Sequence, residues 1–327
     1  MHAPQGSAER LFEQGSGSLR PLALSVVVPV FDEAESLRPL YDQLRLVMQD
    51  QEAEIIFVDD GSRDGSFDVL QELHDEDPRV KVVRFRRNFG KTAALSAGFQ
   101  LARGRNVVTI DADLQDDPAE ISHLCAKLDE GYDLVSGWRQ RRIDPLSKRL
   151  PSSFFNLAVR SFTGIHLHDF NCGLKAYRRN VVEDLRLYGE QHRFIPLLAN
   201  WRGFKVTEVP VNHRPRKHGH SKFGAGRLSA GFLDFMQVLF LTTYMRSPLR
   251  LFGAAGVGVF AVGLVLGLYL TAIWLGGESI GRRPLLTLAV LLMVAGLQLI
   301  STGLVGEMLR NVTYNPREEY AIEQILD

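Results

Sequence analysis

The sequence predicts an α/β fold with a doubly wound, mostly parallel sheet and flanking helices, followed by an α-helical membrane anchor of two spans. Short β-branched apolar runs alternate with helical patterns between residues 24 and 110, which is typical of parallel sheets. Acidic clusters follow three of these runs and so fall at one edge of the sheet. Two long apolar segments near the end of the chain predict the anchor.

The expected elements of the sheet follow one another in regular order. Apolar runs predict strands over residues 24–30, 54–58, 80–85 and 106–110. Amphipathic or Ala-rich stretches predict helices over about 34–48, 66–74 and 92–102. Residues 1–22 contain no apolar run, so they are expected to form a disordered tail rather than a signal peptide.

Two segments are long and apolar enough to cross a membrane. Leu251–Leu275 has 25 residues and Pro284–Gly306 has 23, and neither contains Asp, Glu, Lys, Arg or His. At about 1.5 Å per residue, each spans a hydrocarbon layer of about 30 Å. The eight residues between them allow only a tight hairpin. Two buried core helices are the alternative, although core helices of this length usually carry a polar face.

Residues 226–247, directly before the spans, are mostly apolar and predict an interfacial amphipathic helix. A buried helix of the globular domain is the alternative. Arginines on the outer flanks of the spans outnumber those in the hairpin loop, which favours a cytoplasmic globular domain. The outer arginines are Arg246, Arg250, Arg310 and Arg317, and the loop contains Arg282 and Arg283. The expected location is therefore the inner or plasma membrane, as a multi-pass protein that crosses it twice.

Charge and cysteine content argue against a nucleic-acid-binding protein and against a fold held by disulfides or a zinc cluster. The chain has no net charge, and residues 1–250 contain 34 Lys and Arg against 32 Asp and Glu, so nucleic acid is not a favoured partner. Cys125 and Cys172 are the only cysteines, too few for a disulfide framework or a zinc cluster, which suits a reducing compartment.

Carboxylates follow three of the expected strands. In a doubly wound sheet, ligands bind at the carboxyl ends of the strands, so three acidic ends in succession predict one shared site. The carboxylates concerned are Asp32 with Glu33, Asp59 with Asp60, and Asp111 with Asp113.

The spacing of Asp111, Asp113 and Gln115 indicates a cation site at the end of the fourth strand. Residues two apart point to opposite faces of a regular strand, so their side chains converge only where the strand breaks into a turn. Carboxylate and amide oxygens together with substrate phosphates suit Mg²⁺ or Mn²⁺.

Seven segments carry a resemblance to a known family. Val26–Glu33, Val58–Ser62, Arg87–Lys91 and Asp111–Gln115 together resemble family 2 glycosyltransferases of the GT-A fold. Asp169–Arg178, Phe194–Asn200 and Arg216–Lys222 are similar to the polyprenyl-phosphate glycosyltransferases. These are relatives of dolichol-phosphate mannose synthase and include bacterial enzymes that act on undecaprenyl phosphate. The resemblance runs from about residue 24 through the second span.

The resemblance implies a nucleotide-sugar donor site and a catalytic site. Phe31 and Asp32 depart from the Tyr and Asn of the family motif, which weakens the expectation of base contacts there. The implied nucleotide-sugar residues are Pro29, Phe31, Glu33, Asp59, Asp60, Lys91 and Asp111. The implied ligands of Mg²⁺ or Mn²⁺ are Asp111, Asp113 and Gln115, and the implied catalytic residues are Asp113 and Asp169.

The resemblance also implies an acceptor-phosphate site. Two anions must approach each other, so basic side chains have to screen the repulsion and orient the acceptor. A phosphate monoester is mostly a dianion at neutral pH and needs little help from a general base, so Asp169 is expected to position groups. The implied acceptor residues are Arg139, Arg149, Arg216, Ser221 and Lys222.

The favoured function is transfer of one sugar, with inversion, from a nucleotide sugar to a membrane polyprenyl phosphate, giving a lipid-linked sugar for the cell envelope. UDP donors are favoured over GDP donors because the anchor resembles the bacterial type. One alternative is a membrane protein that binds nucleotide sugars without turnover. Another is a processive polysaccharide synthase, although Gln191–Phe194 does not match its motif and two spans form no channel. The sugar and the existence of a homo-oligomer are left open.

These expectations divide the chain into five regions. The regions are the tail 1–22, the GT-A catalytic domain 23–225, the interfacial helix 226–247, the hairpin 248–309 and the cytoplasmic tail 310–327. His213, His218 and His220 are interpreted as loop residues rather than a metal trio. Gly263 and Gly267 are interpreted as a helix-packing face in the first span.

Overall fold

The structure is a computed structural model that describes residues 22–49, 51–140, 167–187, 189, 191–214, 248–277, 279 and 284–313. The chain divides into two compact units, residues 1–225 and 226–327. The interfacial helix expected at 226–247 and the tail expected at 1–22, apart from its last residue, lie outside the described residues.

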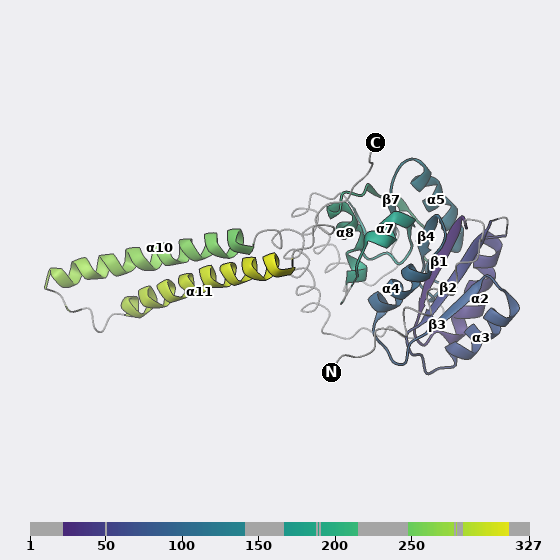
Figure 1. Cartoon of the computed structure of the whole chain (residues 1–327), viewed down its shortest axis with the longest axis horizontal. Helices are drawn as coiled ribbons and strands as arrows, with labels where there is room; N and C mark the ends of the chain where they lie inside the picture. Colours follow the sequence, from purple (N-terminus) through teal and green to yellow (C-terminus); the bar gives the residue numbers. More distant parts are fainter. Residues whose placement is uncertain are drawn as a thin grey trace. The chain divides into compact units, whose positions relative to one another are not determined.

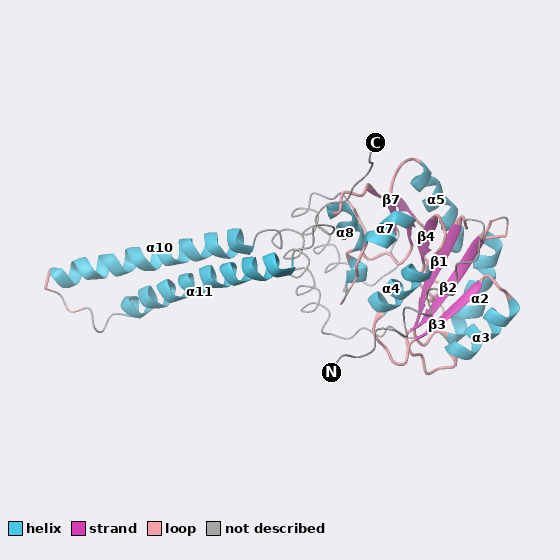
Figure 2. Ribbon diagram, viewed as in Figure 1, coloured by secondary structure: helices cyan, strands magenta, loops and turns pink. Residues whose placement is uncertain are grey.

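A seven-stranded mixed sheet forms the centre of the first unit (Figure 2). Its order is β3-β2-β1-β4-β6-β5-β7, and every pairing is parallel except the two made by β6. The strands are β1 Leu24–Val30, β2 Ala53–Asp59, β3 Val80–Arg84, β4 Asn106–Thr109, β5 Leu134–Trp138, β6 Lys175–Arg178 and β7 Val206–Pro210. The predicted α/β fold with a mostly parallel sheet is confirmed.

Helices cover both faces of this sheet (Figures 1 and 2). One core contains buried residues of α2, α3 and α5, and the other contains buried residues of α4, α7 and α8. Their bounds are α2 Ala34–Val47, α3 Ser66–Glu76, α4 Lys91–Leu101, α5 Ile121–Asp129, α7 Arg179–Asp184 and α8 Ile195–Trp201. Two short 3₁₀ turns, η1 Pro118–Glu120 and η2 Gln191–Arg193, complete the first unit's described helical segments.

Burial on both faces explains why the first strands are continuous apolar runs. Val26 and Val28 of β1 pack into the core on one face, and Val27 between them packs into the core on the other. Helix α2 needs only one apolar stripe, which Leu37, Leu40 and Leu44 provide at helical spacing.

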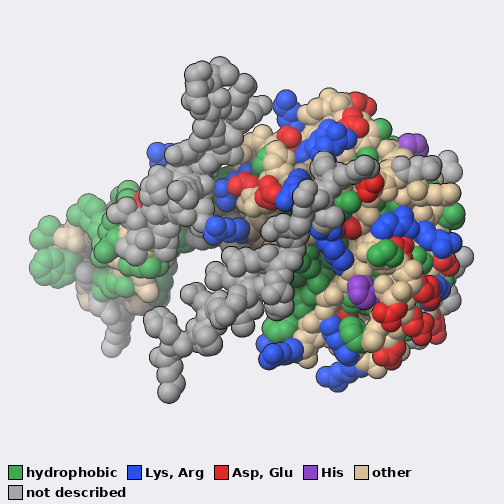
Figure 3. Space-filling model, turned by 45° about the vertical axis from the view of Figure 1, so that its right-hand side comes forward, with side chains coloured by type: hydrophobic (Ala, Val, Ile, Leu, Met, Phe, Trp, Pro, Cys, Tyr) green, Lys and Arg blue, Asp and Glu red, His purple; other side chains and the backbone are tan. Residues whose placement is uncertain are grey.

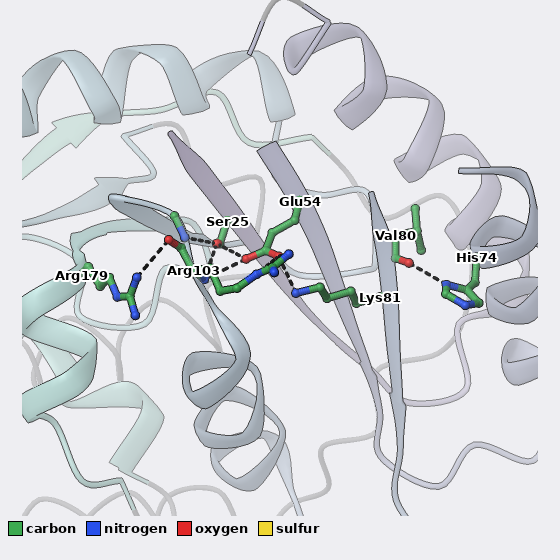
Figure 4. Close-up of polar contacts among 8 residues, drawn as sticks. Ser25, Glu54, His74, Val80, Lys81, Arg103 and Arg179 are labelled. Carbon is green, nitrogen blue, oxygen red and sulfur yellow. Dashed lines mark hydrogen bonds and ion pairs between the residues drawn. The ribbon is translucent and has the colours of Figure 1, made fainter. Parts of the chain in front are cut away.

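A buried glutamate joins four segments at the amino ends of the strands (Figure 4). Glu54 of β2 is only 2% exposed. It accepts a hydrogen bond from the Ser25 hydroxyl of β1 at 2.7 Å and forms an ion pair with Lys81 of β3 at 2.6 Å. Arg103, before β4, donates its backbone N–H at 2.8 Å. This network links the amino ends of β1, β2 and β3 to the segment before β4, at the end of the strands opposite the acidic clusters.

The second unit contains a helical hairpin (Figure 1). Helix α10 is Pro248–Leu275 and α11 is Pro284–Thr313, so both begin with proline, which suits the first turn of a helix. Both are long and apolar enough to cross a membrane. The exposed large hydrophobic side chains lie mostly in the hairpin, whereas charged side chains of both signs are spread over the face of the first unit that Figure 3 shows.

Glycines seven residues apart form the seam between α10 and α11. A Cβ atom at Gly256 would lie 2.7 Å from the Gly296 carbonyl oxygen, and one at Gly263 would lie 2.8 Å from the Ala289 carbonyl oxygen. At Gly267 the nearest atom outside its own helix's backbone would be 3.8 Å away, an ordinary contact. The seam therefore uses Gly256 with Gly263, two positions seven residues apart, rather than the expected pair Gly263 with Gly267.

Candidate active site

The acidic turn after β4 has the shape that the residue spacing requires. Leu114 has a φ of 60°, in the left-handed region, so the chain leaves the extended conformation there. Asp111, Asp113 and Gln115 are half-buried and alternate with the buried Ala112 and Leu114. The Gln115 backbone N–H donates to the Asp113 carboxylate at 3.2 Å. The turn therefore presents three oxygen-bearing side chains along one short segment.

Asp111 forms an ion pair with the first residue of α4. Lys91 Nζ lies 2.5 Å from Asp111 Oδ1, and each side chain is about one-third exposed. Burial alone raises the pKa of the Asp111 carboxyl, but the charges of Lys91 and Lys175 outweigh it and hold the pKa below its ordinary value. A Cβ atom at Gly173 would lie 2.5 Å from this carboxylate, so only glycine fits beside it.

A second ion pair, between Arg139 and Asp169, lies deeper. Arg139 donates Nε to Asp169 Oδ2 at 2.7 Å and a terminal nitrogen to Oδ1 at 3.2 Å, a bidentate arrangement. Their side chains are 16% and 3% exposed. Burial lowers the pKa of Arg139, but the Asp169 charge and hydrogen bonds more than offset it and the pKa is raised. Arg139 therefore stays charged at every accessible pH.

The buried Lys175 lies near both ion pairs. No role was expected for it from the sequence. It lies in β6 opposite Thr109 of β4 and Ser136 of β5, and it is 4% exposed. Its ammonium donates to the Cys172 carbonyl oxygen. Burial lowers the pKa of Lys175, and the charge of Lys91 acts in the same direction. A lysine between Leu174 and Ala176 is the sequence signal that could have found it.

The acidic pair at the end of β2 lies beneath the surface. Asp59 is 0% exposed and its Oδ1 accepts the Ser62 backbone N–H at 2.9 Å. Both Asp60 oxygens accept backbone N–H groups, from Phe89 at 2.7 Å and from Gly90 at 2.9 Å. Burial raises the pKa of Asp60 despite these two bonds. These carboxylates thus hold the loops on either side of the site, and their contact with a nucleotide stays a prediction.

The β1–α2 loop is fastened to the β2–α3 loop. Asp32 has a φ of 50° and donates its backbone N–H to the Ser62 hydroxyl at 2.9 Å. Glu33 donates its backbone N–H to the Ser66 hydroxyl, also at 2.9 Å. Pro29 and Phe31, before these residues, are half-buried. The implied base-binding loop is thereby fixed relative to the end of β2.

The structure brings some of the expected site residues together and leaves others undescribed. Lys91 and Asp111 are in contact, as are Arg139 and Asp169, and the charge of Arg139 contributes to lowering the Asp111 pKa. The expected acceptor residues Arg149, Arg216, Ser221 and Lys222 lie outside the described residues.

The acidic turn fits a divalent cation whose coordination is completed by a substrate. Among the described residues, no group of three or more His, Cys, Asp and Glu side chains is arranged to hold a metal ion. Asp111, Asp113 and the Gln115 amide oxygen supply the hard oxygen atoms that Mg²⁺ and Mn²⁺ prefer. Mg²⁺ commonly binds to one or two carboxylates and completes its shell with substrate phosphates and water.

Both cysteines are unpaired, as expected. Cys172 is buried, and Cys125 is half-buried. Burial raises the pKa of Cys125 to about 11 and also raises the pKa of Cys172, so both are protonated, unreactive thiols.

Comparison with known proteins matches both units. A model of glycosyl transferase family 2 matches residues 25–186, and a model of the GtrB C-terminal hairpin matches residues 247–312. Dodecaprenyl-phosphate galacturonate synthase of Rhizobium johnstonii is 36% identical over 319 residues, which are 94% of each chain. Undecaprenyl-phosphate 4-deoxy-4-formamido-L-arabinose transferase of Pseudomonas paraeruginosa is 38% identical over 93% of this chain and 90% of its own.

Solved structures share the fold at lower identity. Glucosyl-3-phosphoglycerate synthase from Mycobacterium tuberculosis in complex with phosphoglyceric acid superposes with a TM-score of 0.53 at 22% identity, over 74% of this chain and 85% of that chain. The same enzyme in complex with Mn²⁺, UDP-glucose and phosphoglyceric acid gives 0.52 at 21% identity, over 72% and 86%. With the predicted GT-A fold confirmed, this chain belongs to glycosyl transferase family 2 and is a glycosyltransferase.

Proposed function

We propose that the protein transfers one glycosyl group from a nucleotide sugar, UDP-linked rather than GDP-linked, to the phosphate of a membrane polyprenyl phosphate. The observation that carries this proposal is the similarity to polyprenyl-phosphate transferases over both the α/β unit and the hairpin. A polyprenyl tail stays in the bilayer, so an enzyme that acts on its phosphate gains from an anchor. We place the protein in the inner membrane with the α/β unit, residues 23–225, on the cytoplasmic side.

The reaction is a single displacement at the anomeric carbon. An acceptor phosphate oxygen forms the new bond while the bond from the anomeric carbon to the donor diphosphate breaks, and the diphosphate keeps the electron pair. Attack opposite the leaving group inverts the configuration. The acceptor is mostly a dianion at neutral pH, because the second pKa of a phosphate monoester is near 6. No proton has to be removed from it.

Acidic and basic side chains have different roles in binding the donor. Asp111, Asp113 and Gln115 would hold Mg²⁺ or Mn²⁺, which supplies charge neutralisation for the leaving diphosphate. Lys91 Nζ lies 2.5 Å from Asp111 Oδ1. Its ammonium would therefore also reach a donor diphosphate bound to a cation at that carboxylate. Pro29, Phe31, Glu33, Asp59 and Asp60 would form or support the nucleoside pocket.

Basic side chains orient the acceptor. Arg139 is held by both oxygens of Asp169, which leaves the remaining guanidinium N–H groups for a phosphate. Asp169 thereby acts as a positioning residue rather than a base. Arg149, Arg216, Ser221 and Lys222 complete the proposed acceptor site.

A donor panel tests the proposal. The purified full chain in detergent receives undecaprenyl phosphate, Mg²⁺ or Mn²⁺, and UDP- and GDP-linked sugars one at a time, and nucleoside diphosphate release is measured. We expect release from a UDP-sugar that needs both lipid and metal and that falls at least about a hundredfold in Asp113→Asn. The control is Asp75→Asn, which removes an exposed carboxylate from α3. Release that is independent of lipid, or full turnover by Asp113→Asn, would contradict the proposal.

A further inference from the structure

A buried carboxylate and a buried imidazole face each other behind the acidic turn. Asp116 and His213 form an isolated antiparallel β-bridge, and their side chains are 4% and 8% exposed. His213 Nδ1 and Asp116 Oδ1 are 3.6 Å apart. At this distance the two atoms are not hydrogen-bonded to each other, and neither makes a hydrogen bond to another group in the described part of the chain. His213, interpreted from the sequence as a loop residue, is thus a buried partner of Asp116.

The carboxylate determines which imidazole nitrogen carries the proton. An ionised carboxylate only accepts hydrogen bonds, and leaving a buried one without a donor is costly. Among the described groups, His213 Nδ1 is the donor that faces Asp116 Oδ1, so the proton belongs on Nδ1. In the neutral imidazole the other nitrogen, Nε2, is then an acceptor.

The acceptor nitrogen faces the amide of Gln115. Gln115 Nε2 lies 3.5 Å from His213 Nε2 and 3.4 Å from the Arg214 carbonyl oxygen. The Arg214 backbone N–H donates to the Gln115 carbonyl oxygen at 2.8 Å, which holds the two segments together. Both neighbours of the side-chain amide are acceptors, so its NH₂ group points to them. The amide oxygen of Gln115 then points away from His213 Nε2 and from the Arg214 carbonyl oxygen.

We propose that Asp116 and His213 are positioning residues that orient the Gln115 amide so that its oxygen faces the cation site. The proposal rests on the proposed function, because it takes Gln115 as a cation ligand. It explains why a carboxylate and an imidazole are buried together behind a turn that has two other carboxylates. An isosteric amide at position 116 can donate to His213 Nδ1. The proton would then move to Nε2, the amide of Gln115 would turn over, and its NH₂ group would face the cation.

The test is direct measurement of Mn²⁺ binding to the full chain in detergent, by the loss of the free Mn²⁺ signal in electron paramagnetic resonance. Titrations run with UDP and, in parallel, with GDP. We expect Asp116→Asn to weaken Mn²⁺ binding about tenfold, as is usual for partners that orient metal ligands. The matched control is Asp117→Asn, which removes the neighbouring carboxylate that pairs with the Arg214 guanidinium at 2.5 Å. It is expected to bind Mn²⁺ as the unmodified chain does.

A double-mutant cycle separates this role from direct ligation by His213. Gln115→Ala weakens Mn²⁺ binding by itself, and adding Asp116→Asn should then cause no further loss. A loss of the same size in both backgrounds would overturn the proposal. No nucleotide-dependent Mn²⁺ binding by the unmodified chain would refute the proposed function together with it. Normal binding by that chain and an unchanged Asp116→Asn variant would refute the positioning role alone.

Nitrogen NMR of the imidazoles provides a readout that does not depend on activity or on bound metal. The proposal predicts that His213 in the unmodified chain, without metal, is the neutral tautomer protonated at Nδ1. Its resonance is assigned by its absence from His213→Gln. A His213 protonated at Nε2 would overturn the proposal.

Discussion

At the scale of single residues, the site is built from charges that hold one another in place. The Arg139–Asp169 pair is nearly buried, and the Lys91–Asp111 pair is partly open to solvent. Buried ion pairs cost desolvation energy and are weak contributors to stability, so their value here is geometric. The two pairs fix a guanidinium and a carboxylate where two anionic substrates are proposed to meet.

Arg139→Lys is expected to lower kcat/KM for the polyprenyl phosphate by at least about tenfold, because an ammonium cannot form the bidentate contact with Asp169 and also orient a phosphate. The effect should be mainly on the KM for the lipid, with the donor KM unchanged. The control is Arg179→Lys, whose pair with Glu183 is exposed. Equal changes in both substrate KM values would indicate general damage instead of a role in acceptor binding.

His192 predicts a pH dependence of stability. Burial and the charge of Lys91 lower its pKa to about 3, against an ordinary value near 6.5. Below pH 6.5 the unfolded chain therefore binds a proton that the folded chain does not, and this group costs stability as the pH falls. Urea unfolding of the full chain in detergent should show a shallower loss of stability between pH 6.5 and 4.5 in His192→Gln. Parallel curves would show that His192 is not held neutral.

At the scale of elements, the amino edge of the sheet depends on Glu54. Burial raises the pKa of the Glu54 carboxyl, but hydrogen bonds from Lys81 and Ser25 lower it by more, so the pKa is below its ordinary value. A lowered folded-state pKa contributes stability that is present above the unfolded value near 4.3 and is lost as the pH falls through the folded value.

Glu54→Gln should therefore destabilise the protein by about 1–3 kcal/mol at pH 7, because it removes the buried negative charge that pairs with the partly exposed Lys81 and Arg103. The difference from the unmodified chain should shrink below pH 4. Thermal unfolding at both pH values measures it. Glu183→Gln, at an exposed pair, serves as the control. A Glu54→Gln deficit that is the same at pH 7 and below pH 4 would exclude the charge as its cause.

The hairpin predicts a clear difference between two glycines. A Cβ atom at Gly296 would lie 2.6 Å from the Phe260 backbone nitrogen, whereas one at Gly267 meets only the Met293 side chain at 3.8 Å. Gly296→Leu should separate the helices and increase hydrogen exchange along α10 and α11, whereas Gly267→Leu should leave exchange unchanged. Equal protection in the two variants would contradict the seam.

At the scale of the whole molecule, the features that the sequence predicted are those that depend on a local pattern of residues: the first strands, the acidic turn and the hairpin. Strands β1, β2 and β4 were foreseen because burial on both faces makes most of each strand an apolar run, as at Val26–Val28. Strand β3, at one end of the sheet, was foreseen from its three valines. The turn at Asp111–Gln115 was foreseen from its spacing and its place after such a run. The hairpin was foreseen from length and apolarity alone.

Long-range contacts determined what the sequence could not predict. Strand β6 contains Lys175 and runs antiparallel between β4 and β5, so its burial comes from distant partners rather than from its own composition. The same holds for Asp116 and His213, which are 97 positions apart in the sequence and meet through one β-bridge. Lys175 is marked locally only by its place between Leu174 and Ala176, and no local pattern marks Asp116 or His213 as part of a site.

The central claim is transfer of a single glycosyl unit to a lipid phosphate. The most direct measurement is the mass of the lipid after incubation of the full chain with undecaprenyl phosphate, divalent metal and each UDP- and GDP-sugar in turn. The account predicts one product, heavier than the acceptor by one glycosyl residue, from a UDP-linked donor. An unchanged lipid with every donor, or a ladder of products with successive sugars, would contradict it.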